Sequence, residues 1–180
     1  KHGGNGILTG DHPNGTSRVW ETFKKIKNEN IDLVLNMQGD QVMLSPKNIS
    51  KLVKLMREHN SSIGTLASKL IKDEINDQNV CKAEVETELK EDSFLKAKDF
   101  FRTKKDLKNK KIYHHVGIYC FQPSCLKKYV EFGESKQEKI QKLEQLRVLG
   151  KIDINVGYCD SNPLSVDTLE DLLIVEKAMR

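Results

Sequence analysis

Residues 31–40 read Ile31-Asp32-Leu33-Val34-Leu35-Asn36-Met37-Gln38-Gly39-Asp40. The near-continuous apolar content of residues 31–37 predicts a buried strand of the kind found at the centre of a parallel sheet. In open α/β sheets, ligands bind beyond the carboxyl ends of the strands. A carboxylate at Asp40, after a glycine that lets the backbone turn, is therefore suited to hold a divalent cation against phosphates. The plain alternative is that Asp40 only caps the turn before the next helix.

The segments on either side of this run alternate between strand and helix patterns. Expected helices cover residues 16–28, 45–59, 123–132, 137–149 and 169–179. Expected strands cover residues 6–9, 62–70, 112–121 and 151–158. Alternating acidic and apolar residues around 81–89 indicate a solvent-facing antiparallel strand or hairpin. This order predicts one α/β domain over residues 1–180, with a mostly parallel sheet flanked by helices.

Composition narrows the function classes. The 180 residues include 30 Lys or Arg and 26 Asp or Glu, so the formal net charge is +4. No basic cluster with interleaved aromatic residues accompanies that surplus, so we expect no nucleic-acid partner. No apolar run of about 18 residues occurs, which predicts no membrane span. Zinc-ligand spacing is absent, and reduced thiols of a cytoplasmic protein are expected at Cys81, Cys120, Cys125 and Cys159.

Two segments near the chain ends carry candidate binding residues. Residues 165–171 contain Asp167, which is either a helix N-cap or a second metal carboxylate. Residues 11–18 form a polar loop that runs into a helix, where backbone N–H groups can receive anionic oxygens. A simple N-cap at Thr16 would explain most of the second pattern.

Two further candidates lie in the second half of the chain. In the strand expected at residues 112–121, His115, Gly117 and Tyr119 share one face and resemble the wall of a small polar pocket. The ordinary alternative is that His115 is a surface histidine or a hydrogen-bonded histidine of the core. Glu144 and Arg147 share a helix face, and an ordinary surface ion pair would explain them equally well.

Five motifs, by their residues and by their order along the chain, resemble one protein family. The motifs are Asp11-His12-x-x-Gly15-Thr16-x-Arg18, Asn36-x-Gln38-Gly39-Asp40, His115-x-Gly117-Ile118-Tyr119, Leu143-Glu144-Gln145-Leu146-Arg147-Val148-Leu149 and Val166-Asp167-Thr168-x-Glu170-Asp171-Leu172. In this order they resemble the 3-deoxy-manno-octulosonate cytidylyltransferase (CMP-Kdo synthetase) family of lipopolysaccharide synthesis. The resemblance spans nearly the whole chain and is weakest between residues 72 and 111.

The resemblance implies a fold and an activity. The fold would be a Rossmann-like nucleotidyltransferase, with a smaller sugar-contacting and dimer-forming subdomain within about residues 72–135. The enzyme would be a cytoplasmic homodimer that uses Mg²⁺ to convert CTP and 3-deoxy-D-manno-octulosonate (Kdo) into CMP-Kdo and pyrophosphate. Asp40 and Asp167 match the metal carboxylates, which would also be the catalytic residues.

The same resemblance assigns substrate-binding positions. Those nearest the cytidine would be Gly15, Thr16 and Arg18. Those lining the sugar pocket would be Gln38, His115, Tyr119, Glu144 and Gln145. Arg102, in the motif Ala97-x-x-Phe100-Phe101-Arg102, matches a family arginine and could pair bidentately with the Kdo carboxylate.

The chain also departs from the family pattern. The family begins with a strand and an Arg/Lys-rich triphosphate loop, and neither has a counterpart after Lys1. We therefore expect the first βα unit to be missing and the 180 residues alone to be inactive. Gln41 stands where the family has a glutamate, and Phe101 stands where it has a serine. Two alternatives remain: a cytidylyltransferase for another acid sugar such as N-acylneuraminate, and a non-catalytic binding module.

Overall fold

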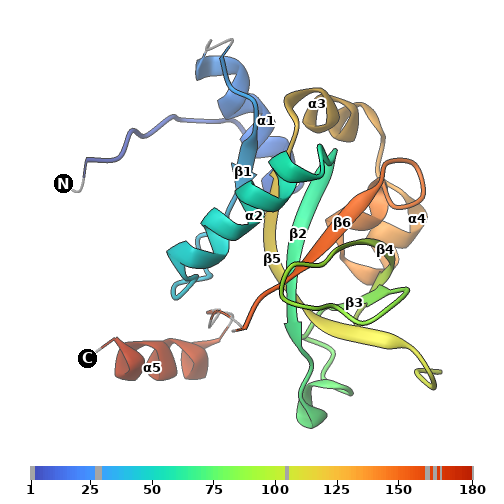
Figure 1. Cartoon of the computed structure of the whole chain (residues 1–180). Helices are drawn as coiled ribbons and strands as arrows, with labels where there is room; N and C mark the ends of the chain where they lie inside the picture. Colours follow the sequence, from blue (N-terminus) through green and yellow to red (C-terminus); the bar gives the residue numbers. More distant parts are fainter. Residues whose placement is uncertain are drawn as a thin grey trace.

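The computed structural model describes residues 3–26, 30–103, 106–160, 163, 166 and 168–179. Its helices are α1 (Gly15–Ile26), α2 (Pro46–Glu58), α3 (Pro123–Glu131), α4 (Lys136–Gln141) and α5 (Leu169–Ala178), with short 3₁₀ turns η1 (Lys72–Glu74) and η2 (Glu144–Arg147). Its strands are β1 (Val34–Asn36), β2 (Ile63–Lys69), β3 (Lys82–Val85), β4 (Phe94–Phe101), β5 (Lys111–Phe121) and β6 (Ile154–Tyr158). Figure 1 shows the strands gathered into one sheet with helices around it.

The sheet is mixed rather than mostly parallel. Its order is β1-β5-β2-β6-β4-β3, and an additional β5–β3 pairing closes part of the sheet into a ring. Of the six pairings between described strands, only β2–β6 is parallel. β1 and β2 do run in the same direction, as their connection through α2 predicts, but β5 lies between them and runs the opposite way.

The antiparallel pairing of β3 with β4 and β5 has a local cause. A parallel neighbour needs a long crossover, usually a helix, whereas antiparallel strands need only a short connection. β3, β4 and β5 follow one another with no helix among the described residues that connect them. This confirms the predicted antiparallel pairing around residues 81–89. β3 is buried along its whole length, however, and not solvent-facing, because it is paired on both sides.

Two hydrophobic clusters lie on opposite faces of the sheet. α2 covers one face, where Leu52 and Met56 pack against Leu66 of β2. The other cluster contains Ile63 and Ala67 of β2, together with the buried side of α3. β2 therefore alternates its side chains between the two clusters, as the period of two predicts. Ser45 accepts a hydrogen bond from the Lys47 N–H and begins α2 at the predicted residue.

Two predicted elements differ in the structure. Residues 6–9 do not pair with any described strand, and Leu8 is 91% exposed. The helix expected over residues 137–149 breaks at Lys142, whose φ of 52° is left-handed, and the chain continues as the 3₁₀ turn η2. The break matters for the site because it separates Glu144 from the helical geometry that its spacing suggested.

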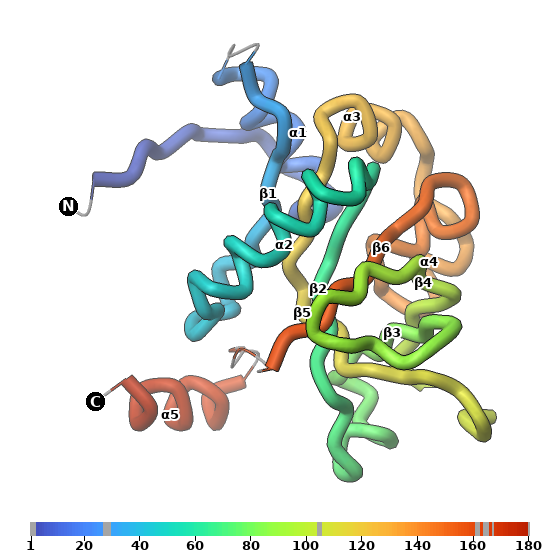
Figure 2. Tube along the Cα trace, viewed as in Figure 1, coloured from blue at the N-terminus to red at the C-terminus, as the bar shows by residue number. Residues whose placement is uncertain are grey.

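The terminal segments extend away from the body of the sheet. Figure 2 shows the segment before α1 and the helix α5 reaching toward the same side of the molecule, away from β3 and β4. Within the described residues, every helix is too short or too polar to cross a lipid bilayer.

Candidate active site

A polar cavity of about 450 Å³ lies where the turn after β1, the end of β4, the strand β5 and η2 meet. That size is in the range of small-molecule sites in proteins. Seven of the eleven predicted site residues line it: Gln38, Asp40, Arg102, His115, Tyr119, Glu144 and Gln145. These residues come from four separate elements, so the fold brings together motifs that are far apart in the sequence.

Asp40 and its neighbour Gln41 present unpaired oxygens at this cavity. Asp40 Oδ1 and Gln41 Oε1 are buried, and neither has a hydrogen-bond partner among the described residues. A buried carboxylate oxygen without a donor is costly unless a ligand supplies one. Mg²⁺ is held by one or two protein carboxylates together with phosphate oxygens and water, so the donor set at Asp40 fits such a cation.

The second predicted metal carboxylate, Asp167, lies outside the described residues. On either side of it, Val166 donates its backbone N–H to the Asp40 carbonyl at 3.1 Å, and Thr168 lines the cavity. Thr168 also caps α5, because its hydroxyl accepts from the Asp171 N–H. Among the residues that the structure describes, no group of three or more His, Cys, Asp or Glu is placed to hold a metal ion.

His115 on β5 is a neutral hydrogen-bonding group. Its Nε2 lies 2.9 Å from Thr65 Oγ1, and that hydroxyl lies 2.7 Å from the Ile118 carbonyl oxygen. The hydroxyl has one proton, which it donates to the carbonyl, so His115 donates from Nε2 and keeps Nδ1 as an acceptor. Burial lowers the pKa of His115 to about 3, with a smaller contribution from His114. Its imidazole is therefore uncharged at neutral pH.

A glycine makes room beside His115. A Cβ atom at Gly117 would lie 2.7 Å from Gln41 Nε2 and 3.7 Å from the amide of Gln38. The register between β2 and β5 also shifts between Thr65 and Leu66, which is an irregularity of the kind found next to active sites. The predicted polar wall on β5 is therefore present, with the two glutamine side chains packed against it.

The backbone carbonyl of Arg102 is bound by a buried lysine that the sequence did not single out. Arg102 Nη1 donates to the carbonyls of Gln78 and Asn79, at 3.2 and 2.6 Å. Lys82, with an exposed fraction of 0%, donates from Nζ to the carbonyls of Asp77 (2.5 Å) and Arg102 (2.8 Å). Burial lowers the pKa of Lys82. The available signal was a cation within a short strand whose neighbours are apolar.

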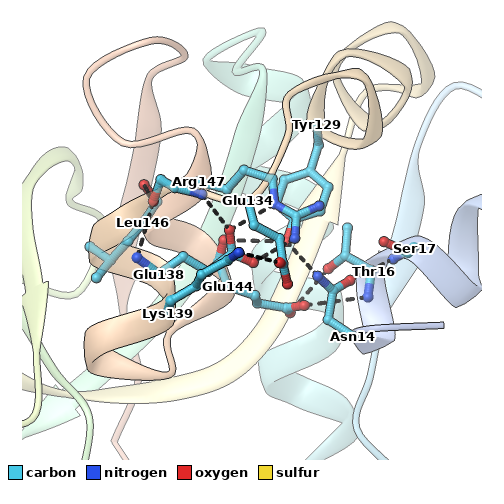
Figure 3. Close-up of polar contacts among 11 residues, drawn as sticks. Asn14, Thr16, Ser17, Tyr129, Glu134, Glu138, Lys139, Glu144, Leu146 and Arg147 are labelled. Atoms are coloured by element: carbon cyan, nitrogen blue, oxygen red, sulfur yellow. Dashed lines mark hydrogen bonds and ion pairs between the residues drawn. The ribbon is translucent and has the colours of Figure 1, made fainter.

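The three residues predicted near the cytidine do not line the cavity. Thr16 is buried beside it, and its hydroxyl donates to Glu144 Oε1 at 3.0 Å while its N–H reaches Oε2 at 3.4 Å (Figure 3). Gly15 lies at the side chain of Asn36, which would be 3.9 Å from an added Cβ. Arg18 is exposed and donates to Thr9 Oγ1 at 2.6 Å.

Glu144 does not pair with Arg147, so the surface-pair interpretation is wrong. Arg147 instead makes a bidentate contact with Glu138, at 2.9 and 2.5 Å, and both side chains are buried. The reason is the break at Lys142, after which Glu144 turns toward Thr16. Burial raises the pKa of Glu144, and the hydrogen bonds from Thr16 oppose that rise.

Cys81 is the one cavity-lining cysteine among the described residues. Gln145 Nε2 lies 3.4 Å from its Sγ, and burial raises the pKa of the thiol to about 12. A thiol with that pKa is a poor nucleophile at neutral pH. All four cysteines are free, as the sequence predicted.

Comparison with known proteins places the chain in a family. The family model for cytidylyltransferases matches residues 3–153. The 3-deoxy-manno-octulosonate cytidylyltransferase of Thermodesulfovibrio yellowstonii is 35% identical over 98% of this chain and 74% of its own length. The enzyme of the same name from Bartonella tribocorum is 36% identical over 96% of this chain and 72% of its own length.

The chain belongs to the 3-deoxy-manno-octulosonate cytidylyltransferase family.

Solved structures agree with this membership. CMP:2-keto-3-deoxy-manno-octonic acid synthetase in complex with CTP superposes with a TM-score of 0.85 at 29% identity, covering 98% of this chain and 73% of that one. An apo UDP-glucose pyrophosphorylase reaches a TM-score of 0.64 at 14% identity and shares the fold alone. The predicted α/β nucleotidyltransferase fold of this octulosonate cytidylyltransferase family member is thus confirmed.

Proposed function

We propose that this chain binds CTP and Kdo and belongs to an enzyme that makes CMP-Kdo and pyrophosphate. The observation that carries the proposal is one cavity that Arg102, His115, Tyr119 and Gln145 line together with Asp40, whose buried Oδ1 has no hydrogen-bond partner among the described residues. A cation, several neutral hydrogen-bonding groups and a metal-binding carboxylate suit an acidic, hydroxyl-rich sugar that reacts with a nucleoside triphosphate.

In the proposed reaction, the anomeric hydroxyl oxygen of Kdo attacks the α-phosphorus of CTP. A bond forms between that oxygen and phosphorus, and the hydroxyl proton is released to solvent. The bond from the α-phosphorus to the bridging oxygen breaks, and pyrophosphate leaves with the bridging oxygen. Such a transfer depends mainly on positioning and charge stabilisation. Arg102 would pair with the sugar carboxylate, while Gln38, His115 and Gln145 would bind hydroxyl groups.

His115 has a defined part in this scheme. With Nε2 committed to Thr65, its free Nδ1 is an acceptor for a sugar hydroxyl. Tyr119 remains a hydrogen-bond donor, since burial raises its pKa well above the usual value. The two rings lie 5.4 Å apart, so they would contact neighbouring groups of one ligand.

Mg²⁺ belongs to the proposal as well. Asp40, with Asp167, would hold the cation, which supplies charge neutralisation on the triphosphate when bound. The support is the unpaired Oδ1 of Asp40. The remaining assignments rest on the family resemblance. They are Gly15 and Arg18 near the cytidine, a homodimer formed through residues 72–135, a cytoplasmic location and a role in lipopolysaccharide synthesis.

Calorimetric titration with each ligand, followed by a pyrophosphate-release assay, tests the function. We expect the chain to bind Kdo more tightly than N-acetylneuraminate, and to bind CTP only with Mg²⁺ present. Preference for N-acetylneuraminate would favour the other acid-sugar activity, although the octulosonate name of the relatives described above argues against it. Absence of all binding would refute the proposal.

A further inference from the structure

Tyr129 is a buried residue of α3 that lies beneath the cavity. It is 1% exposed and lines a small adjoining hollow with Thr16, Tyr119 and Glu144, without lining the main cavity. Its hydroxyl lies 3.2 Å from the Glu144 backbone carbonyl and 3.3 Å from Asn14 Nδ2. One hydroxyl group therefore contacts both Asn14 and Glu144, which are 130 positions apart in the sequence (144 − 14).

The direction of these hydrogen bonds is determined by their neighbours. Asn14 Oδ1 accepts the Ser17 N–H at 2.9 Å, so its Nδ2 is the atom left to donate to Tyr129. The tyrosine hydroxyl accepts there and donates its own proton to the Glu144 carbonyl. Burial raises the pKa of Tyr129, so the hydroxyl keeps that proton at neutral pH.

A second connection joins the same two segments. The Glu144 carboxylate accepts from the N–H and the hydroxyl of Thr16, and the Thr16 hydroxyl accepts from Asn36 Nδ2 at 3.0 Å. Figure 3 shows the turn at Asn14–Thr16 facing Glu144, with Tyr129 next to both. The backbone and the side chain of Glu144 are thus tied to this turn by separate hydrogen bonds.

The ring of Tyr129 is held by an independent set of contacts. The guanidinium carbon of Arg147 lies 4.8 Å from the ring centroid, within the range of a cation–π interaction. Arg147 is itself fixed by its bidentate contact with Glu138, and Glu138 forms a capping box with Ser135. The hydroxyl is consequently presented from a ring that has little freedom to move.

We propose that Tyr129 is a positioning residue that locks the Asn14–Thr16 turn to Glu144 and so couples the nucleotide side of the site to the acid-sugar side. The inference rests on the proposed function for what each side binds. Tyr129 acts through Asn14 and Glu144 and contacts neither substrate. Nothing in the five sequence motifs assigns it a role.

Amide hydrogen exchange in the ligand-free chain tests directly whether Tyr129 holds the Asn14–Thr16 turn against Glu144. Tyr129→Phe keeps the ring and removes only the hydroxyl, and it should speed exchange at the Thr16 and Ser17 amides by about tenfold, as expected for the loss of one buried hydrogen bond. Tyr113→Phe is the matched control, because its hydroxyl accepts from the Leu89 N–H at 2.9 Å and lies outside the cavity lining. Exchange at Thr16 and Ser17 that is unchanged in Tyr129→Phe would overturn the lock.

Ligand titrations test the coupling. Tyr129→Phe should raise the dissociation constants of both CTP and Kdo by about three- to tenfold, whereas Tyr113→Phe should change neither. If Tyr129→Phe weakened the binding of only one of the two ligands, or of neither, the coupling would be contradicted. If the unsubstituted chain bound neither ligand while the exchange difference persisted, the proposed function would fail and the lock would stand.

Discussion

Asp40 is the residue at which the metal assignment can be tested most directly. Asp40→Asn keeps the size of the side chain but removes the negative charge of its unpaired oxygen, so Mg²⁺-dependent CTP binding should weaken by at least about tenfold. Calorimetric titration of CTP at several Mg²⁺ concentrations measures this. Asp153→Asn is the control, because Asp153 is exposed and pairs with Lys96 at 2.6 Å. CTP binding that keeps its full Mg²⁺ dependence in Asp40→Asn would refute the assignment.

Substitution of Lys82 should disturb Arg102, although Lys82 itself does not line the cavity. Lys82→Met retains the aliphatic stem and leaves the carbonyls of Asp77 and Arg102 without their donor, so the free energy of unfolding should fall by about 1–3 kcal/mol. Kdo binding should weaken as Arg102 shifts, while CTP binding should be little affected. The measurements are urea denaturation and calorimetry.

A surface lysine on the neighbouring strand provides the comparison for Lys82. Lys98 lies on β4 and pairs with Glu86 at 3.1 Å, and both side chains are largely exposed. Lys98→Met should therefore change the unfolding free energy by less than about 1 kcal/mol. Equal effects of the two substitutions would show that Lys82 has no special structural role.

At the scale of elements, the close contact between α2 and β2 depends on Gly64. A Cβ atom there would lie 2.5 Å from Met56 Sδ and 2.7 Å from Phe94 Cζ, so these two side chains must shift in Gly64→Ala. We expect a loss of about 1–3 kcal/mol in the free energy of unfolding. Gly133→Ala, where the added Cβ would meet nothing within 4 Å, should be nearly neutral, and thermal or urea denaturation separates the two cases.

The strand directions of the sheet also differ from those that the sequence predicted. Apolar periodicity identified β2, β5 and β6, and the capping residue Ser45 marked the start of α2 correctly. Strand direction could not be read in this way, because period-two patterns are the same in parallel and antiparallel strands. The position of β5 between β1 and β2 follows from pairing energies over the whole sheet, which no local pattern contains.

At the scale of the whole molecule, His115 makes stability depend on pH. Its pKa is lowered from an ordinary 6.5 to about 3 in the folded chain, so the unfolded chain takes up the proton first on acidification. Stability from this group is complete above about pH 6.5 and is lost as the pH falls toward 3, by up to about 1.4 kcal/mol per pH unit. Urea denaturation at a series of pH values measures this slope.

A conservative variant isolates the contribution of His115. His115→Gln can still donate from Nε2 to Thr65 but cannot take up a proton, so its unfolding free energy should depend less on pH between about 6.5 and 4.5. The raised pKa of Glu144 acts with the opposite sign, since stability falls as pH rises through its titration, and it is common to both proteins. Identical slopes in the His115→Gln variant and the unsubstituted chain would contradict the assignment of the pH dependence to His115.

The cavity shows how far sequence reasoning reached. The family resemblance assigned seven residues that the structure places around one cavity, and local patterns had independently singled out Asp40, His115 and Tyr119 among them. Lys82 and Tyr129 were missed for a common reason. Each acts on a segment that is distant in sequence, and neither sits in a motif whose spacing suggests that role.

Local sequence therefore specified the helices, most of the strands, their caps and the chemical character of the candidate site, since those depend on neighbours within a few residues. Long-range packing set the strand directions, the break after α4, the pairing of Arg147 with Glu138 and the contact between Thr16 and Glu144 across 128 residues. The physical reason is that a buried polar group takes whichever partner the packed chain brings within hydrogen-bonding distance. That partner is known only when the paths of all the connecting segments are known.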